Sequence, residues 1–100
     1  MSSGDEPLPE QRCVLEIRNE KGMHLQAAML IVGIAEQFKD RAQMTVSKDG
    51  RTADAGSIMG ILTLEATQGS HIEVVATGPE ASDALAAVRA MVEAGFNEEK

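Results

Sequence analysis

Apolar and polar residues alternate over residues 13–18, where Leu15 and Ile17 are separated by Glu16 and followed by Arg18. A period of two is typical of a strand with one face on the core. Two further segments alternate in the same way and are predicted to be strands: residues 42–47 and the stretch that holds Ile72, Val74 and Ala76.

Apolar residues recur at helical spacing in two longer segments. The first runs from His24 to Phe38, and the second follows Gly78-Pro79 and ends at Gly95. The predicted buried stripes are Ala28, Ile31, Val32, Ala35 and Phe38 in the first helix and Ala84, Leu85, Val88, Met91 and Val92 in the second.

Turn and cap residues add two short elements. Asp49-Gly50 favours a hairpin because positive φ is inexpensive there, so residues 51–55 are predicted to return as a strand. Ser57 is a good N-cap and predicts a short helix over residues 58–64.

The predicted order of elements is therefore β-α-β-β-α-β-α. It indicates an α+β fold, an open-faced β-sandwich in which a four-stranded antiparallel sheet carries three helices on one face. The 100 residues have room for one domain, residues 12–97, after a flexible tail of residues 1–11. The outer face of the sheet is predicted to be exposed: Glu16, Arg18, Gln43, Thr45, Glu73 and Thr77.

Composition excludes several classes of function. Nine basic against sixteen acidic residues (net charge −7) and 2% aromatic residues argue against nucleic-acid binding and against anionic membranes. Cys13 is the only cysteine, which rules out an internal disulfide and fits a cytoplasmic protein. We expect no metal and no cofactor, because Asp49, Asp54 and Glu65 form no recognisable metal-binding loop.

His24 is the main candidate for chemistry. It lies between a glycine loop and the first turn of a predicted helix, where free backbone N–H groups and the helix dipole favour an anion and a neutral imidazole. A phosphoryl group on the ring would lie against N–H groups near Gln26 and Ala27. The alternative is that His24 is only an N-cap. The second histidine, His71, is predicted to be an exposed surface residue on a strand.

Ser57 and the apolar run after it form a second candidate. As an isolated signal Ser57 is only a helix cap, although a phosphate there would also lie at a helix N-terminus. Met59 follows in a run too apolar for a short surface helix. Such a patch beside a reactive histidine suits partner docking, through Ile58, Met59 and Leu62.

Several segments together resemble the HPr family, the histidine phosphocarriers of the bacterial phosphotransferase system. The resemblance covers about residues 12–96, and the predicted order of elements is also the family's. The matching segments are Gly22-Met23-His24, Ala27-Ala28, Lys48-Asp49-Gly50-Arg51, residues 55–62, Thr67-Gln68-Gly69 and Gly78.

This resemblance implies a phosphoryl carrier of the sugar-transport system that is not itself an enzyme. Enzyme I would phosphorylate His24 on Nδ1, and His24 would pass the group to an enzyme II A-domain. The resemblance also implies a regulatory phosphorylation of Ser57 by an HPr kinase/phosphorylase, with the apolar residues after Ser57 as the docking helix. We also predict that the protein is a monomer.

One departure from the family pattern affects the site itself. Gln26 stands where the family has an arginine, and Ala27 where it has a proline. Gln26 can donate a hydrogen bond but brings no charge, and charge-assisted bonds are about twice as strong as neutral ones. Of the other cations, Arg18, Lys21 and Arg51 are all candidates to replace the arginine.

A different reading is a regulatory binding module. In that case Gln26 marks a relaxed carrier role, and phosphorylation of Ser57 switches docking through Ile58, Met59 and Leu62.

Overall fold

A four-stranded antiparallel sheet forms the base of the molecule. The computed structural model describes residues 10–98. The strands lie in the order β1-β4-β2-β3, so β1 and β3 are the edges. Their bounds are β1 Glu10–Glu16, β2 Gln43–Lys48, β3 Arg51–Asp54 and β4 His71–Thr77.

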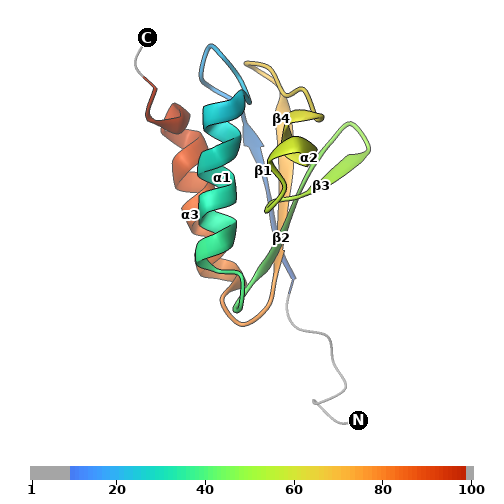
Figure 1. The fold of residues 1–100 in the computed structure, drawn as a ribbon, viewed down its shortest axis with the longest axis vertical. Coiled ribbons are helices and arrows are strands. Elements are labelled where there is room, and N and C mark those ends of the chain that lie inside the picture. The colour runs from blue at the N-terminus through green and yellow to red at the C-terminus, as the bar shows by residue number, and fades with distance from the viewer. Residues whose placement is uncertain (1–9, 99–100) are drawn as a thin grey trace.

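Three helices cover one face of this sheet and leave the other face open (Figure 1). Their bounds are α1 Leu25–Gln37, α2 Ile58–Leu62 and α3 Ala81–Glu93, and a short 3₁₀ turn, η2 Gly95–Asn97, follows α3. Figure 1 also shows that the C-terminal turn lies at the same end of the molecule as the loop before α1. The predicted fold class and order of elements are confirmed.

The core lies between the sheet and the helices, and the predicted strand alternation is observed. Burial of a large aliphatic side chain contributes roughly 1.5–3 kcal/mol, so this layer dominates folding. The largest fully buried side chains are Ile17, Ile31, Ile61, Ile72, Val46, Val74, Val88 and Val92.

The buried stripe of α1 differs from the predicted one. Ala27 and Ile34 are buried, whereas Val32, Ala35 and Phe38 are only partly buried. The reason is that α1 contacts both α2 and α3, so the centre of its buried arc is displaced from the predicted one.

The ends of some elements also differ from prediction. Glu10 pairs with Thr77, so residues 10 and 11, which we assigned to the tail, belong to β1. The first residues of this edge strand are polar and carry no apolar alternation that could reveal them. Residues 1–9 lie outside the described residues. The helix predicted over residues 58–64 ends at Leu62.

None of the six side chains predicted to be exposed on the outer face of the sheet is buried. Three of its side chains are exposed, and the other three are half-buried between neighbouring strands. The exposed ones are Glu16, Arg18 and Gln43, and the half-buried ones are Thr45, Glu73 and Thr77.

Residues 10–98 contain neither a candidate membrane-spanning helix nor a candidate metal-binding cluster. No helix there has both the length and the apolar character needed to cross a bilayer. Within the same residues, no group of His, Cys, Asp or Glu side chains is arranged to hold a metal ion.

Candidate functional site

The loop before α1 is held in one conformation by the neighbouring loop. Gly22 has a φ of +67°, and a Cβ at this position would lie 2.6 Å from the carbonyl oxygen of Ala66. Only glycine fits such a close approach in left-handed backbone. The next amide, that of Met23, donates a hydrogen bond of 2.8 Å to the same oxygen. These contacts fix where the chain enters α1.

His24 is the N-cap of α1, with extended backbone and a part-buried side chain. Its Nδ1 accepts a hydrogen bond of 3.2 Å from the backbone N–H of Gln26. Its Nε2 contacts Oε2 of Glu98. An ionised carboxylate only accepts hydrogen bonds, so the ring proton lies on Nε2 and Nδ1 keeps its lone pair. Nδ1 of His24 is therefore both the atom that caps α1 and the potential nucleophile.

Glu98 is the site residue that the sequence analysis missed. It lies 74 positions from His24 in the chain. The hydrogen bond from His24 lowers the pKa of Glu98 below its ordinary value, and Asn19 and Lys21 act in the same direction. The carboxylate is therefore ionised at neutral pH and fixes the orientation of the imidazole, as the aspartate does in other histidine sites.

The turn after α3 brings Glu98 to this position. Gly95 has a φ of +65°, and Phe96 and Asn97 are also left-handed, with φ of 56° and 59°. Phe96 is 4% exposed, so its ring anchors the turn on the core. An apolar residue just after a helix-ending glycine is a known signal of a chain that folds back, and it is present in the sequence.

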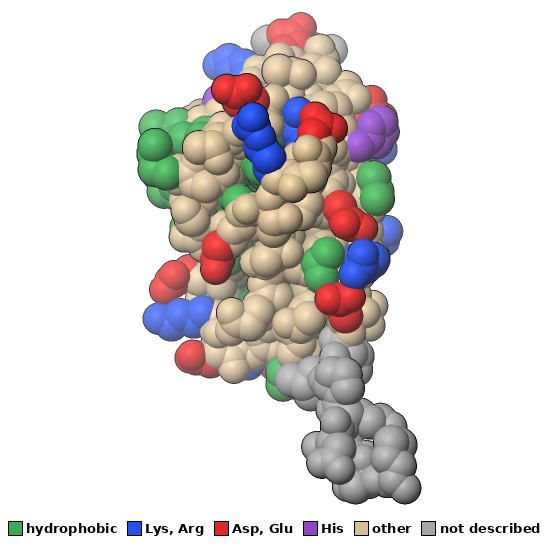
Figure 2. Space-filling view, turned by 90° about the vertical axis from the view of Figure 1, so that its right-hand side faces the viewer, with side chains coloured by type: hydrophobic (Ala, Val, Ile, Leu, Met, Phe, Trp, Pro, Cys, Tyr) green, Lys and Arg blue, Asp and Glu red, His purple; other side chains and the backbone are tan. Residues whose placement is uncertain are grey.

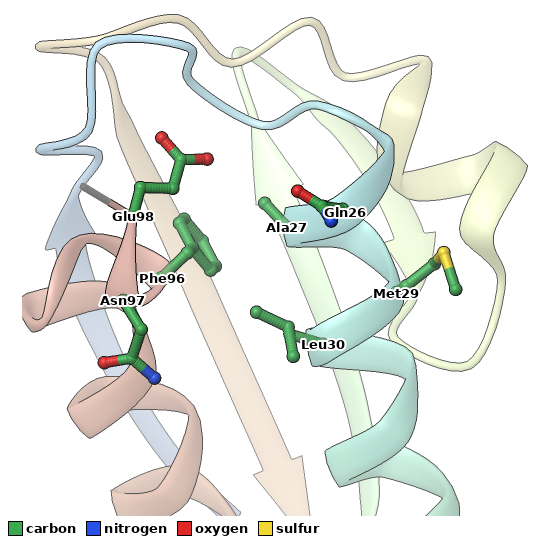
Figure 3. A pocket seen from close by; sticks show the side chains of 7 residues that line it. All are labelled: Gln26, Ala27, Met29, Leu30, Phe96, Asn97 and Glu98. Carbon is green, nitrogen blue, oxygen red and sulfur yellow. The ribbon is translucent and has the colours of Figure 1, made fainter. Parts of the chain in front are cut away.

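A cleft of about 400 Å³ separates this turn from the first half of α1. In Figure 3, Phe96 and Leu30 point toward each other across it, and Gln26 and Ala27 lie at the α1 side. Gln26 is exposed, whereas the Ala27 side chain is fully buried. The cleft opens beside the imidazole of His24, because Glu98 is also one of its lining residues.

The predicted second candidate lies beside α1. Ser57 caps α2, because its Oγ accepts a hydrogen bond of 3.0 Å from the N–H of Gly60. Met59 is 70% exposed, while Ile58 and Leu62 are half-buried. No hydrogen bond joins Ser57 to His24 in the part of the chain that the structure describes.

Exposed apolar side chains of α1 and α2 form one surface, which we call the apolar patch. The two helices contact each other, and Figure 2 shows hydrophobic side chains gathered along one edge of the upper half of the molecule. The patch consists of the exposed Leu25, Met29, Leu30 and Met59 and the half-buried Ile58 and Leu62. Leu30 lies at its border with the cleft that faces Phe96.

The three candidate cations have different surroundings. Arg51 donates a hydrogen bond of 3.0 Å to the carbonyl oxygen of Thr63, at the end of α2. Arg18 and Lys21 line a cavity together with Glu98. Lys21 also helps to lower the pKa of Glu98. Lys21 is therefore the candidate whose charge acts on the His24–Glu98 pair.

Comparison with known families decides the assignment. Residues 11–94 match the family model PTS-HPr, described as the PTS HPr component phosphorylation site. The chain belongs to the HPr family. The resemblance that the sequence motifs indicated is thereby confirmed.

Relatives and solved structures agree with this assignment. The chain is 39% identical over 85 residues to the phosphocarrier protein NPr of Escherichia coli (strain K12), covering 85% of this chain and 93% of that protein. It is 33% identical over 85 residues to the phosphocarrier protein HPr of Treponema pallidum, covering 85% and 94%. The crystal structure of HPr-C-His from Thermoanaerobacter tengcongensis superposes with a TM-score of 0.83 at 34% identity, covering 90% and 99%.

Family membership settles the broad function. HPr-family proteins are phosphocarriers of the phosphotransferase system and not enzymes, as the sequence analysis expected.

Proposed function

We propose that His24 accepts a phosphoryl group on Nδ1 from phosphorylated enzyme I and passes it to an enzyme II A-domain. The observation that carries this proposal is the pair of contacts on the ring. Nε2 faces the carboxylate of Glu98, while the lone pair of Nδ1 faces the N-terminus of α1.

The proposed chemical step is a nucleophilic attack by Nδ1 of His24 on phosphorus. The Nδ1 lone pair attacks phosphorus, and the bond from phosphorus to the donor breaks with its electron pair returning to the donor. The imidazole of His24 then carries a positive charge, which the Nε2–H shares with the carboxylate of Glu98. A preorganised carboxylate lowers the energy of this charge without any rearrangement.

The helix N-terminus receives the phosphoryl oxygens. Once Nδ1 is bonded to phosphorus, the N–H of Gln26 loses its acceptor on His24. This N–H and that of Ala27 are free first-turn donors of α1, which can bind a dianion together with the helix dipole. Gln26 contributes a side-chain amide where a cation would bind more strongly.

Partner docking is assigned to the apolar patch. Met59 is the most exposed of its large hydrophobic side chains, and Leu25 directly follows His24 in the chain. Contiguous exposed apolar surface on a small monomeric domain is typical of an interaction site. Enzyme I and the enzyme II A-domain would bind this surface in turn, in the cytoplasm, with the carrier acting as a monomer.

The test is phosphoryl transfer followed by intact-protein mass. The protein is incubated with phosphoenolpyruvate and the enzyme I from the same genome. We expect one acid-labile phosphate adduct on the wild type and on His71→Ala, and none on His24→Ala. An adduct that persists in His24→Ala would overturn the assignment.

A second candidate function is a regulatory module switched at Ser57. Its support is local: the half-buried Oγ caps α2 beside Met59, so a phosphate there would add charge next to the apolar patch. An HPr kinase/phosphorylase would be the modifying enzyme. If Ser57→Asp binds every partner with the affinity of Ser57→Ala, this second function is excluded.

A further inference from the structure

Asn19 is the one buried polar side chain in residues 10–98, at 7% exposed. Its Nδ2 donates a hydrogen bond of 2.8 Å to the carbonyl oxygen of Gly22, and the Gly22 N–H donates one of 3.1 Å to the Asn19 carbonyl oxygen. Two bonds between the same residues close the loop that leads into α1.

The Gly22 carbonyl oxygen also accepts a hydrogen bond of 3.0 Å from the N–H of His24. The amide of Asn19 and the backbone of His24 therefore share one acceptor. A shift of the Asn19 side chain would therefore move the Gly22 carbonyl group and, with it, the backbone of His24.

Asn19 also lies near Glu98, the carboxylate that contacts Nε2 of His24. It lines the same cavity as Glu98 and Gly95. It is also one of the groups that favour the ionised form of Glu98. The side chain thus lies between the loop before His24 and the turn that holds the carboxylate on His24.

An asparagine at this place is poorly explained by stability alone. Its Oδ1 is buried and has no hydrogen-bond partner among the described residues. A buried acceptor without a partner is unfavourable, and such groups are uncommon in native proteins. What asparagine supplies is an NH₂ group with two donors, one for Gly22 and one that can face Glu98.

We propose that Asn19 is a positioning residue for His24, which holds the Gly22 loop and the Glu98 carboxylate so that the ring proton stays on Nε2 and Nδ1 stays free. This proposal rests on the proposed function in one respect: a free Nδ1 is useful only if His24 accepts a phosphoryl group. The position of the proton can be measured in the protein without any phosphoryl donor.

The test compares Asn19→Ser with Gln68→Ala. Gln68 donates a hydrogen bond of 3.0 Å from its side chain to the carbonyl oxygen of Arg18. Gln68→Ala therefore also removes a bond that ties down this loop, but a bond whose acceptor is neither Gly22 nor Glu98. The readout is the pair of ¹⁵N chemical shifts of the His24 ring in the neutral form, which gives the ratio of the two tautomers. Thermal unfolding is recorded alongside.

We expect Asn19→Ser to raise the fraction protonated on Nδ1 at least threefold and Gln68→Ala to leave it unchanged, even if both lower the melting temperature. Asn19→Asp, which keeps the side-chain size but has no donor when ionised, serves as the second variant and should shift the ratio further. Unchanged ring shifts in the folded variants would reduce Asn19 to a structural residue. A failure of phosphoryl transfer in the wild type would instead contradict the proposed function and leave this measurement valid.

Discussion

The two histidines of this chain lie on surfaces of different chemistry. His24 is the N-cap of α1 and lies beside the apolar patch, and α1 carries no charged residue before Glu36. His71 lies on the open face of the sheet, where Arg12 forms ion pairs of 2.6 Å with Glu10 and 3.4 Å with Glu73. The helix surface beside His24 is mainly apolar, whereas the sheet face around His71 carries several exposed charged side chains.

Exposure alone would not select His24 over His71 as the proposed phosphoryl acceptor. His71 is the more accessible ring, yet no described side chain forms a hydrogen bond with it. His24 is part-buried, and both of its nitrogens have assigned partners. What sets His24 apart is that a backbone N–H faces its Nδ1 lone pair and a carboxylate faces its Nε2, and these contacts support its proposed role. Each substitution at the His24 site has a matched counterpart on the sheet face or in its β2–β3 hairpin.

The largest effect is expected at the glycine before His24. Gly22→Ala places a Cβ 2.6 Å from the Ala66 oxygen in left-handed backbone, which should lower the free energy of unfolding by about 3 kcal/mol. Gly50→Ala, in the hairpin between β2 and β3, has φ +83° but no atom within 4 Å, and should cost only about 1 kcal/mol. Urea unfolding measures both, and equal losses would refute the close-packed account of the His24 loop.

The fold was largely predictable because its signals are local. Period-two alternation identified β1, β2 and β4, helical spacing identified α1 and α3, the Asp49-Gly50 turn identified β3, and Ser57 identified α2. Glu98 was not predictable, since its contact joins residues 74 positions apart and depends on a turn of left-handed residues. Asn19 was missed for a different reason: a polar residue in a loop is ordinarily exposed, and nothing local indicates its burial.

The second prediction concerns a charge added to the apolar patch, the proposed docking surface. Met59→Lys and Met59→Glu should both lower kcat/KM for phosphoryl transfer from enzyme I by about 30-fold, because an unpaired charge buried in an apolar interface costs about 2 kcal/mol. Val14 is 62% exposed on the sheet face, and Val14→Lys should change the rate less than twofold. Rates are measured at low and high salt.

The two signs of charge make this test decisive. If binding were steered by a charged partner, one Met59 variant would gain where the other loses, and salt would remove the difference. Loss with either sign, independent of salt, is the result expected for an uncharged apolar interface.

The third prediction concerns the ionisation of Glu98. Its pKa is lowered chiefly by the hydrogen bond from His24, so it should rise toward the ordinary glutamate value in His24→Ala and stay unchanged in His71→Ala. Because the folded-state pKa is depressed, the contact stabilises the fold above about pH 4.3 and is lost as the pH falls through the folded-state value. Titration of the carboxyl ¹³C resonance by NMR measures both variants, and an unshifted Glu98 in the wild type would contradict the contact.

The smallest effect is expected where this chain departs from its family. Gln26→Arg adds a cation at the first turn of α1, beside the phosphoryl position, and should lengthen the half-life of the phosphohistidine about threefold, since charge-assisted hydrogen bonds are about twice as strong as neutral ones. Gln43 is also an exposed glutamine, on the sheet face, and Gln43→Arg adds the same charge to the molecule away from the site. The half-life is followed by loss of the acid-labile adduct at neutral pH.

If both variants lengthen the half-life equally, the effect comes from the net charge of the protein and not from the position of the arginine. If neither gains, Lys21 already supplies the cation through its proximity to Glu98, and Lys21→Gln should then shorten the half-life in the wild-type background.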